Sequence, residues 1–238
     1  MSLLTSLYAY YAMEGNANDS TGTYNGTLSG TYNFGSTYGK ILQGFNTTDA
    51  VNGHFKVGTT SNFNFLQNTG EFSISFWMKT IKYTVRNNYP IGNTATSAQK
   101  GFYLGADSVT GTFRLAVFIG NGIPSTLINS AYTNFIQDNN WHHIVVTASK
   151  SNNRVYFYKD GVQYTPTSGT TVGTTTTGNS SNITQIGYTP AAELDGNIDE
   201  VGFWTRELSQ SEVTELYNAG SGLTYPFLSA SSNFFKMF

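Results

Sequence analysis

One turn-rich segment near the start of the chain gathers acidic and amide side chains of the kind that bind hard metal ions. Glu14, Asn16, Asn18, Asp19 and Asn25 lie close together among Gly, Ser and Thr residues. Calcium takes about six to eight oxygen ligands from carboxylates, amides and backbone carbonyls of irregular segments. Asp and Asn side chains are equally typical of turns, where they accept hydrogen bonds from nearby backbone N–H groups. The segment alone leaves both a calcium site and a plain turn open.

Paired carboxylates could instead cleave a sugar chain. A retaining glycosidase needs two carboxyl groups about 5 Å apart, and an inverting one needs them about 6.5 to 9.5 Å apart. Asp199 and Glu200 are consecutive in an alternating segment, so we expect their side chains on opposite faces of one strand. Glu193 and Asp195 could share a side, but they lie in a glycine-bounded loop. We therefore predict no catalytic residue and no enzyme, with a glycoside hydrolase or lyase as the weaker alternative.

Cysteine and histidine supply no convincing site either. The chain contains no cysteine, which excludes disulfides, thiolate metal sites and a thiol nucleophile. His142 and His143 are consecutive in a strand-like segment and are expected to face opposite ways, while His54 stands alone. We do not expect these histidines to chelate one metal ion side by side.

Aromatic residues give a different kind of candidate site. If the apolar residues of segments 102–104, 113–117 and 155–157 fill a core, alternation sends several rings and an arginine to the opposite side of their sheet. Tyrosine offers a flat ring with a hydroxyl, and arginine offers a planar fork of donors, which together suit sugar binding. The alternative is that these rings lie beneath a helix or a long loop. The predicted carbohydrate-binding residues are Tyr103, Arg114, Tyr156 and Tyr158.

Alternating segments throughout the chain must position these residues, and they predict an all-β fold. The clearest is FSISFWMK at 72–79, in which every second residue is apolar. Asp160-Gly161 is a strong two-residue hairpin turn, and polar loops are expected at 83–99 and 165–182, the second with a weak edge strand as an alternative. Further strands are expected at 7–13, 26–34, 41–57, 102–104, 113–119, 141–148, 155–158, 162–164 and 183–187.

The segment 194–208, LDGNIDEVGFWTREL, predicts a late central strand that leads into a helix. Ser209 and Glu212 form a capping box, with Leu208 and Val213 placed for a hydrophobic staple. We expect one helix from near Ser209 that ends by Gly220 and docks its apolar face on the sheets. The rings and aliphatic chains expected to close the core are Trp204, Phe203, Ile198, Trp77 or its neighbour Phe76, and Trp141.

The run IDEVGFWTRELSQSEVTELYNAG resembles the closing signature of the laminin-G-like (concanavalin A-like) jelly-roll family. WHHIVVTAS followed by VYFYKDGV, and YYAMEGNANDSTGTYNGTLSG near the start, match the same family in the expected order. The resemblance implies a two-sheet antiparallel jelly-roll sandwich with one short C-terminal helix. It also implies a structural calcium ion held by Asp19 and Asp199, with Glu14 and Asn25 nearby. The E-x-D-x-x-E pattern of the glucanases that share this sandwich is absent.

Length and composition limit the remaining possibilities. The 238 residues suit one large sandwich, and we expect a domain at 1–226 with a C-terminal tail at 227–238. Charged residues make up only 11% of the chain and the net charge is −2, so the electrostatic attraction that nucleic-acid binding needs is missing. No apolar run approaches the length of about 20 residues that a membrane span requires, and no signal peptide is recognised at the start.

These observations together predict a binding or display module. A neutral, hydroxyl-rich surface and a ring-rich face favour a lectin-like, adhesive domain whose partner is a glycan or cell-surface polysaccharide. Without a signal peptide, we expect it on a phage virion, in the capsid or tail, or on a bacterial cell surface. The alternative is a purely structural virion decoration protein that contacts virion proteins or itself.

Overall fold

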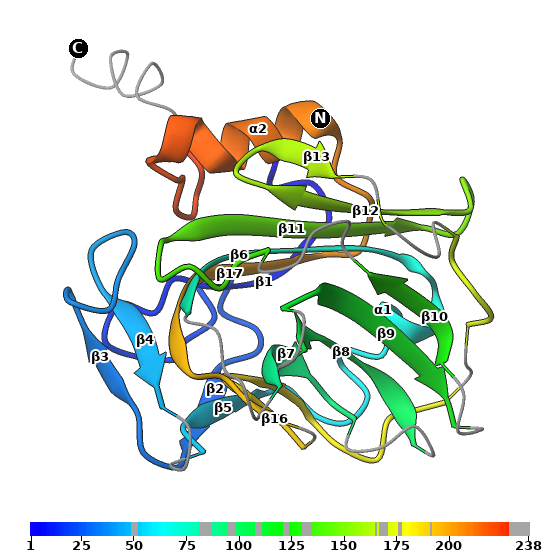
Figure 1. Cartoon of the computed structure of the whole chain (residues 1–238), viewed down its shortest axis with the longest axis horizontal. Coiled ribbons are helices and arrows are strands. Elements are labelled where there is room, and N and C mark those ends of the chain that lie inside the picture. Colours follow the sequence, from blue (N-terminus) through cyan, green and yellow to red (C-terminus); the bar gives the residue numbers. More distant parts are fainter. Residues whose placement is uncertain are drawn as a thin grey trace.

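The computed structural model describes residues 1–48, 52–80, 87–94, 99–107, 111–120, 124–129, 135–164, 166, 171–175, 178–190 and 192–228. Within these residues, two antiparallel sheets pack face to face (Figure 1). The main helix, α2 (Gln210–Tyr217), covers the outer face of one sheet, which we call sheet A. The predicted two-sheet antiparallel jelly roll with one short C-terminal helix is confirmed.

Sheet A carries the long central strands of the molecule. Its described strands run in the order β13-β12-β11-β6-β17-β4-β3, and β1 also pairs with β17. All of these pairings are antiparallel. The strands are β1 (Leu7–Tyr11), β3 (Asn33–Gly35), β4 (Gly44–Thr47), β6 (Glu71–Thr80), β11 (His142–Ser149), β12 (Arg154–Lys159), β13 (Val162–Tyr164) and β17 (Gly196–Trp204).

The second sheet, which we call sheet B, closes the other side of the sandwich. Its described strands run in the order β10-β9-β8-β7-β14-β5-β2, and a small hairpin, β15 with β16, forms a separate two-stranded sheet beside β7. A one-turn helix, α1 (Phe65–Asn68), leads into β6. The strands are β2 (Gly26–Ser29), β5 (His54–Val57), β7 (Asn88–Gly92), β8 (Lys100–Ala106), β9 (Phe113–Ile119), β10 (Pro124–Asn129), β14 (Thr184–Ile186), β15 (Tyr188–Thr189) and β16 (Ala192–Glu193).

The main core lies between the sheets and follows the period-two pattern of the strands. In β6, Phe72, Ile74, Phe76 and Met78 all belong to this core. Trp77, from the alternate set, stacks on Tyr217 of α2 at 5.9 Å between ring centroids, which places it on the outer face of sheet A. The alternation read from the sequence therefore assigns each side of β6 correctly.

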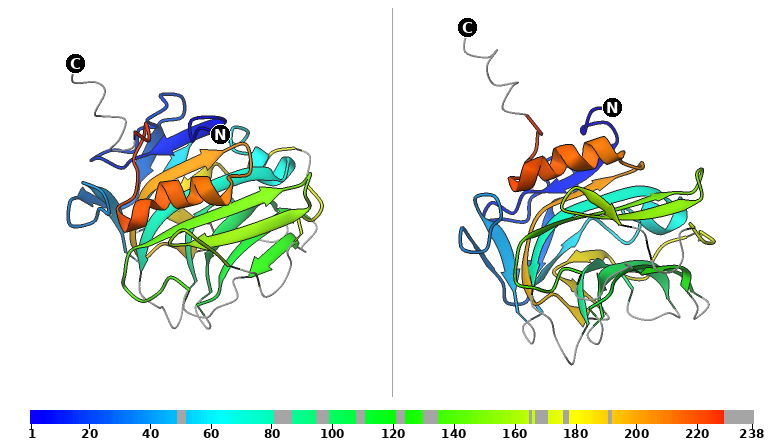
Figure 2. Two further views of the ribbon diagram at one scale, coloured as in Figure 1. Left: turned by 90° about the horizontal axis from the view of Figure 1, so that it is seen from above. Right: turned by 45° about the horizontal axis from the view of Figure 1, so that its top comes forward.

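A second apolar cluster lies on the outer face of sheet A, beneath α2. Figure 2 shows the helix across this face, with the N-terminus beside it. Trp204 is fully buried here, and its indole N–H donates to the Leu3 carbonyl at 2.7 Å. The buried members of the cluster are Leu3, Tyr10, Val145, Tyr158, Trp204, Leu208, Val213, Leu216 and Phe227.

Helix α2 begins and ends as its sequence predicts. Ser209 is the N-cap: its hydroxyl accepts from the Glu212 backbone N–H, and the Glu212 carboxylate accepts from the Ser209 backbone N–H at 2.9 Å. Asn218 closes the helix with a left-handed backbone, at φ 47°. The staple residues Leu208 and Val213 are both buried in the cluster beneath the helix.

Two expectations about individual segments are wrong. Residues 88–92, expected within a polar loop, form the fully buried strand β7 between β8 and β14. Asn, Pro and Gly are uncommon in strands, so the sequence of this segment does not predict one. The pairing of β7 with β8 also shifts register between Asn88 and Ile91. Trp141 is only partly buried because it precedes β11, whereas the other predicted core residues, Trp204, Phe203, Ile198, Trp77 and Phe76, are buried.

The segment after α2 returns to the outer face of sheet A. Phe227 is 8% exposed and its ring lies 5.1 Å from that of Tyr10 and 6.2 Å from that of Trp204. The first residue of the expected tail therefore packs on the domain. Leu228 is exposed, and residues 229–238 of that tail lie outside the described residues.

Candidate functional site

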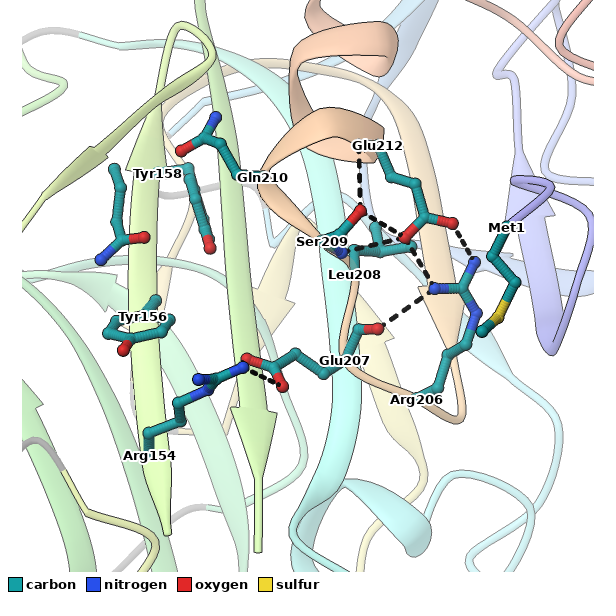
Figure 3. Close-up of a pocket in the computed structure, with 11 residues that line it drawn as sticks. Met1, Arg154, Tyr156, Tyr158, Arg206, Glu207, Leu208, Ser209, Gln210 and Glu212 are labelled. Carbon is teal, nitrogen blue, oxygen red and sulfur yellow. Dashed lines mark hydrogen bonds and ion pairs between the residues drawn. The ribbon is translucent and has the colours of Figure 1, made fainter. Parts of the chain in front are cut away.

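A cleft of about 510 Å³ opens on the outer face of sheet A, beside the first turn of α2 (Figure 3). One wall is β12 with Gln163 of β13, and the other is the segment that joins β17 to α2. Ligand sites for small molecules commonly enclose roughly 300–1,000 Å³. The lining residues are Met1, Arg154, Tyr156, Tyr158, Gln163, Arg206, Glu207, Leu208, Ser209, Gln210 and Glu212.

Strand alternation positions the tyrosines of this cleft. Val155 and Phe157 belong to the core between the sheets, so Arg154, Tyr156 and Tyr158 project from the opposite face of β12. The rings of Tyr156 and Tyr158 meet edge to face, with centroids 6.4 Å apart. Tyr156 is half-buried, whereas Tyr158 is 3% exposed, and burial raises the pKa of its hydroxyl. Tyr156 is thus the ring available to a ligand.

The first charged pair of the cleft is Arg154 with Glu207. Arg154 Nε and Nη2 donate to the two oxygens of Glu207 at 2.8 and 3.0 Å, a two-pronged ion pair that spans the floor between β12 and the segment before α2 (Figure 3). The guanidinium also lies over the Tyr156 ring, 5.3 Å from its centroid. Three of the five N–H donors of Arg154 are left over by this pairing.

In the second pair, Arg206 with Glu212, the arginine uses more of its N–H donors than Arg154 does. Arg206 donates from Nη1 and Nη2 to the Glu212 carboxylate at 2.9 and 2.6 Å. Its other N–H groups donate to the carbonyls of Ser2, Thr5 and Glu207, so all five are used. Burial opposes ionisation of Glu212, but the hydrogen bonds from Arg206 and Ser209 outweigh it and lower the pKa of Glu212. This pair fixes the cleft wall and caps α2.

The four predicted carbohydrate-binding residues do not lie on one face. Tyr156 and Tyr158 line the cleft on sheet A. Tyr103 and Arg114 belong to β8 and β9 of sheet B, where Tyr103 stacks on Tyr89 at 4.3 Å and Arg114 pairs with Asp107 at 2.7 Å. Alternation tells which side of a strand a residue occupies, but it does not tell which of two sheets the strand joins.

The predicted calcium ligands occupy well-bonded positions. Asp19 is buried, and its carboxylate accepts five hydrogen bonds, including those from the backbone N–H groups of Tyr10 and Tyr24. These donors fill the lone pairs, about four, that a carboxylate would offer to a cation. The Asn25 side-chain oxygen accepts from the Asp19 N–H, and Glu14 accepts from the Gln43 N–H. This donor set fits the turn interpretation and does not fit a calcium ion.

Asp199 accepts a separate set of hydrogen bonds. Its carboxylate accepts from the backbone N–H groups of Lys40, Ile41 and Glu200 at 2.8 to 2.9 Å. Among the residues that the structure describes, no three His, Cys, Asp or Glu side chains converge in a way that could hold a metal ion. Calcium binding is thus implied by the resemblance alone, the hydrogen bonds at Asp19 argue against it, and no step below depends on it.

The expectation that Asp199 and Glu200 point to opposite faces is wrong. Ile198 and Val201 both enter the core, while Glu200 has φ 53° and the pairing with β6 shifts register between Asp199 and Gly202. This β-bulge leaves two consecutive residues on the outer face. Burial, and for Asp199 the neighbouring Glu200, raise their pKa values from 3.8 to about 9 and from 4.5 to about 8.

The consecutive histidines are used in separate contacts. His142 lies between two carboxylates, with Nδ1 at 2.8 Å from Asp160 and Nε2 at 3.0 Å from Asp138. His143 is buried, with Nε2 2.8 Å from the Ser75 hydroxyl, and burial lowers its pKa to about 3. Each imidazole thus has its own structural role.

The sequence also matches a known family over most of its length. A model described as the concanavalin A-like lectin/glucanases superfamily, a laminin G family, matches residues 49–214, which is more than half of the chain. The chain belongs to this superfamily. No curated protein sequence matches significantly. Within the described residues of this concanavalin A-like domain, no helix is long and apolar enough to cross a membrane.

Solved structures share the fold of this concanavalin A-like domain. Domain 4 of AbnA, an extracellular arabinanase from Geobacillus stearothermophilus, superposes with a TM-score of 0.65 at 19% identity, over 88% of this chain and 97% of that domain. The binding domain of Paraclostridial Mosquitocidal Protein 1 gives 0.66 at 18% identity, over 91% of this chain and 52% of that one. Botulinum neurotoxin type C gives 0.64 at 17% identity, over 90% and 51%. The chain spans about half the length of these toxin chains.

Several cleft residues of this concanavalin A-like domain were not foreseen. Gln163 lies in the expected strand 162–164, Arg154 directly precedes the expected strand 155–158, and Glu207 lies in the segment 194–208. No local pattern joins residues 154–163 to 206–212. The hairpin β12–β13 and the helix cap meet only after folding, when β11 and β6 lie between β12 and β17. The S-x-x-E capping box at 209–212 is the sequence pattern that falls on the second wall of the cleft.

Proposed function

We propose that this domain is a non-catalytic glycan-binding module and that its sugar site is the cleft between β12 and the first turn of α2. The observation that supports it most is the combination, in one cleft, of the Tyr156 ring, the fixed Arg154–Glu207 pair and exposed amide side chains. Sugars bind where a ring provides a flat apolar surface and a few fixed polar groups orient the hydroxyls.

Two side-chain amides add further polar groups to the cleft. The side-chain amide of Gln163, an exposed residue, makes no hydrogen bond with the described residues. Gln210 donates from Nε2 to the Gly161 carbonyl at 2.7 Å, which orients its side chain beside the cleft. The Gln163 amide can both donate to and accept from a hydroxyl group. Gln210 donates its second N–H to the Thr214 hydroxyl at 3.0 Å, so its oxygen accepts from a ligand. A sugar bound against Tyr156 therefore has partners on both walls.

The acidic residues of the cleft support binding rather than hydrolysis. Glu207 and Glu212 are each held by two hydrogen bonds from an arginine. A general acid needs a carboxyl that stays protonated near neutral pH, whereas the hydrogen bonds from Arg206 and Ser209 lower the pKa of Glu212. Asp199 and Glu200 have raised pKa values, but they are fully buried and do not line the cleft. We therefore assign no catalytic residue.

Proteins with the same fold support a saccharide as the ligand class. Domain 4 of AbnA was solved with arabinotriose, and cell entry of botulinum neurotoxin type C depends on two ganglioside molecules. At identities below 20%, these ligands cannot be transferred residue by residue. They do make a saccharide the first ligand to test. A location on a phage particle or bacterial surface, where the domain would act in adhesion, remains part of this proposal.

Glycan-array binding with two alanine variants tests the proposal. Tyr156→Ala should abolish retention of the sugars that the native protein retains, with its melting temperature nearly unchanged because the ring is half-buried. Tyr103→Ala, on the opposite sheet, is the matched control and should bind normally. Loss of binding in Tyr103→Ala alone would move the site to sheet B. Retention of no glycan, or release of reducing ends from a polysaccharide, would refute the proposed function.

A further inference from the structure

The charges of the cleft limit the class of saccharide it can take. Four charged side chains line it, two arginines and two glutamates, and each arginine is joined to one glutamate by two hydrogen bonds. The cleft side chains therefore carry no net charge, and the one further charged group on a lining residue is the N-terminal amine of Met1, a residue that is 88% exposed. Arg206 has no donor left, so Arg154 is the one described cationic side chain of the cleft that can still donate to a ligand.

Arg154 cannot offer an isolated positive charge to that ligand. Glu207 occupies Nε and one donor of Nη2, and Asn152 Nδ2 lies 3.4 Å from the same carboxylate. An anionic sugar would have to displace Glu207 from Arg154 or lie close to the Glu207 carboxylate. Displacement breaks a two-pronged charged hydrogen bond, and proximity brings two like charges together.

A neutral hydroxyl has neither difficulty. It can accept from one of the remaining N–H groups of Arg154 and donate its own proton to a lone pair of Glu207. Vicinal hydroxyls of a sugar match such an adjacent donor and acceptor, and Gln163 adds another of each. The ion pair therefore serves a neutral polyol better than either charge alone would.

We infer that the cleft selects neutral saccharides over sialylated or uronic-acid-containing ones, and that Glu207 determines this selectivity by occupying Arg154. This inference rests on the proposed glycan-binding function. Specificity of this kind comes from repulsion of the wrong ligand as well as attraction of the right one. Here the Glu207 carboxylate supplies the repulsion, and acidic sugars are the ligands that it disfavours.

The experiment is binding to an array of matched saccharide pairs that differ only in charge, such as lactose and sialyllactose. Native protein should prefer the neutral member of each bound pair by about tenfold or more, the expected effect of one close charge contact. Glu207→Gln keeps the shape of the side chain, frees the guanidinium and adds one positive charge. It should bind the acidic members better by a similar factor, and added salt should reverse this gain.

Glu215→Gln is the matched control, because it changes the net charge equally on the exposed face of α2, outside the cleft. Its preference should equal that of the native protein. Equal or stronger native binding of the acidic members would overturn this inference and leave the glycan-binding function standing, as would an unchanged preference in a folded Glu207→Gln variant. Binding of neither member of any pair would remove the proposed function and this inference with it.

Discussion

Tyr10 of β1 and Glu200 of β17 meet on the outer face of sheet A, where the Tyr10 hydroxyl donates a hydrogen bond to Glu200 Oε2. Both side chains are buried, and the Leu223 carbonyl lies 3.2 Å from the same hydroxyl. Burial and the neighbouring Glu200 raise the pKa of Tyr10 well above its ordinary value. The contact exists because the bulge turns Glu200 out of the core and towards Tyr10.

The burial of Asp199 and Glu200 side by side predicts that stability falls as the pH rises. The folded chain holds protons on Asp199 and Glu200 that the unfolded chain releases near pH 4, because their folded pKa values are about 9 and about 8. Their contribution is complete below pH 4 and is lost progressively up to about pH 9. The lowered pKa of His143 acts in the opposite direction below pH 6.5, so the comparison is made above that range: the melting temperature should be higher at pH 7 than at pH 9. Glu200→Gln should flatten this dependence, whereas Glu215→Gln should not, and an equal slope in both variants would contradict the assignment.

Trp204→Ala should destabilise the domain by about 3–5 kcal/mol, the usual cost of removing a large buried ring. The ring is fully buried and donates to the Leu3 carbonyl, so the variant loses packing and leaves that carbonyl unpaired. Trp141→Ala is the matched control, because Trp141 is only half-buried. Urea denaturation measures both. Equal losses in the two variants would mean that the outer-face cluster contributes no more than a surface ring.

Gly202→Ala should destabilise the domain by about 1–3 kcal/mol through overpacking. A Cβ at Gly202 would lie 2.5 Å from Cη2 of Trp204 and 3.0 Å from Cδ2 of Tyr10, and both rings are buried. At Gly35, another strand glycine, the nearest atom would lie 3.6 Å away, so Gly35→Ala should cost little. Combining Gly202→Ala with Trp204→Ala should cost less than the sum of the two, and strict additivity would show that the rings do not clash.

Chelation tests the calcium assignment directly. If calcium were held by Asp19 and Asp199, EDTA would lower the melting temperature and added calcium would restore it. Because N–H and O–H donors already fill the Asp19 carboxylate, we expect no response to EDTA. Asp19→Asn should still cost about 1–3 kcal/mol by leaving buried donors unpaired. Asp195→Asn, at a carboxylate that accepts no hydrogen bond from the described residues, is the control and should melt like the native protein.

The elements that the sequence predicts well are those in which local pattern and tertiary packing agree. Strand β6 has a clear period of two, and helix α2 has a clear apolar face and a capping box, so the buried face of each could be assigned from the sequence alone. Strand β7 was missed because burial between β8 and β14, and not its composition, makes it a strand. The bulge at Glu200 was missed because nothing local marks a glutamate for a positive φ angle.

The cleft could be predicted only in part, for a geometric reason. Tyr156 and Tyr158 were assigned to the correct side of β12, but Tyr103 and Arg114 proved to be on the other sheet. The partners of the tyrosines come from the helix cap, about fifty residues later in the chain, as the Arg154–Glu207 contact shows. Such a pairing depends on strand order, which alternation does not encode.

The two ion pairs, each held by two hydrogen bonds, also affect the kinetics of ligand binding. Arginine and glutamate side chains lose considerable rotamer freedom when they are ordered. In this cleft that entropy is already lost when the chain folds, since Glu207 and Glu212 hold both guanidiniums in place. A ligand would meet a rigid surface, so association should follow a single step with no slow rearrangement, and differences in affinity among sugars should lie mainly in how fast each one leaves.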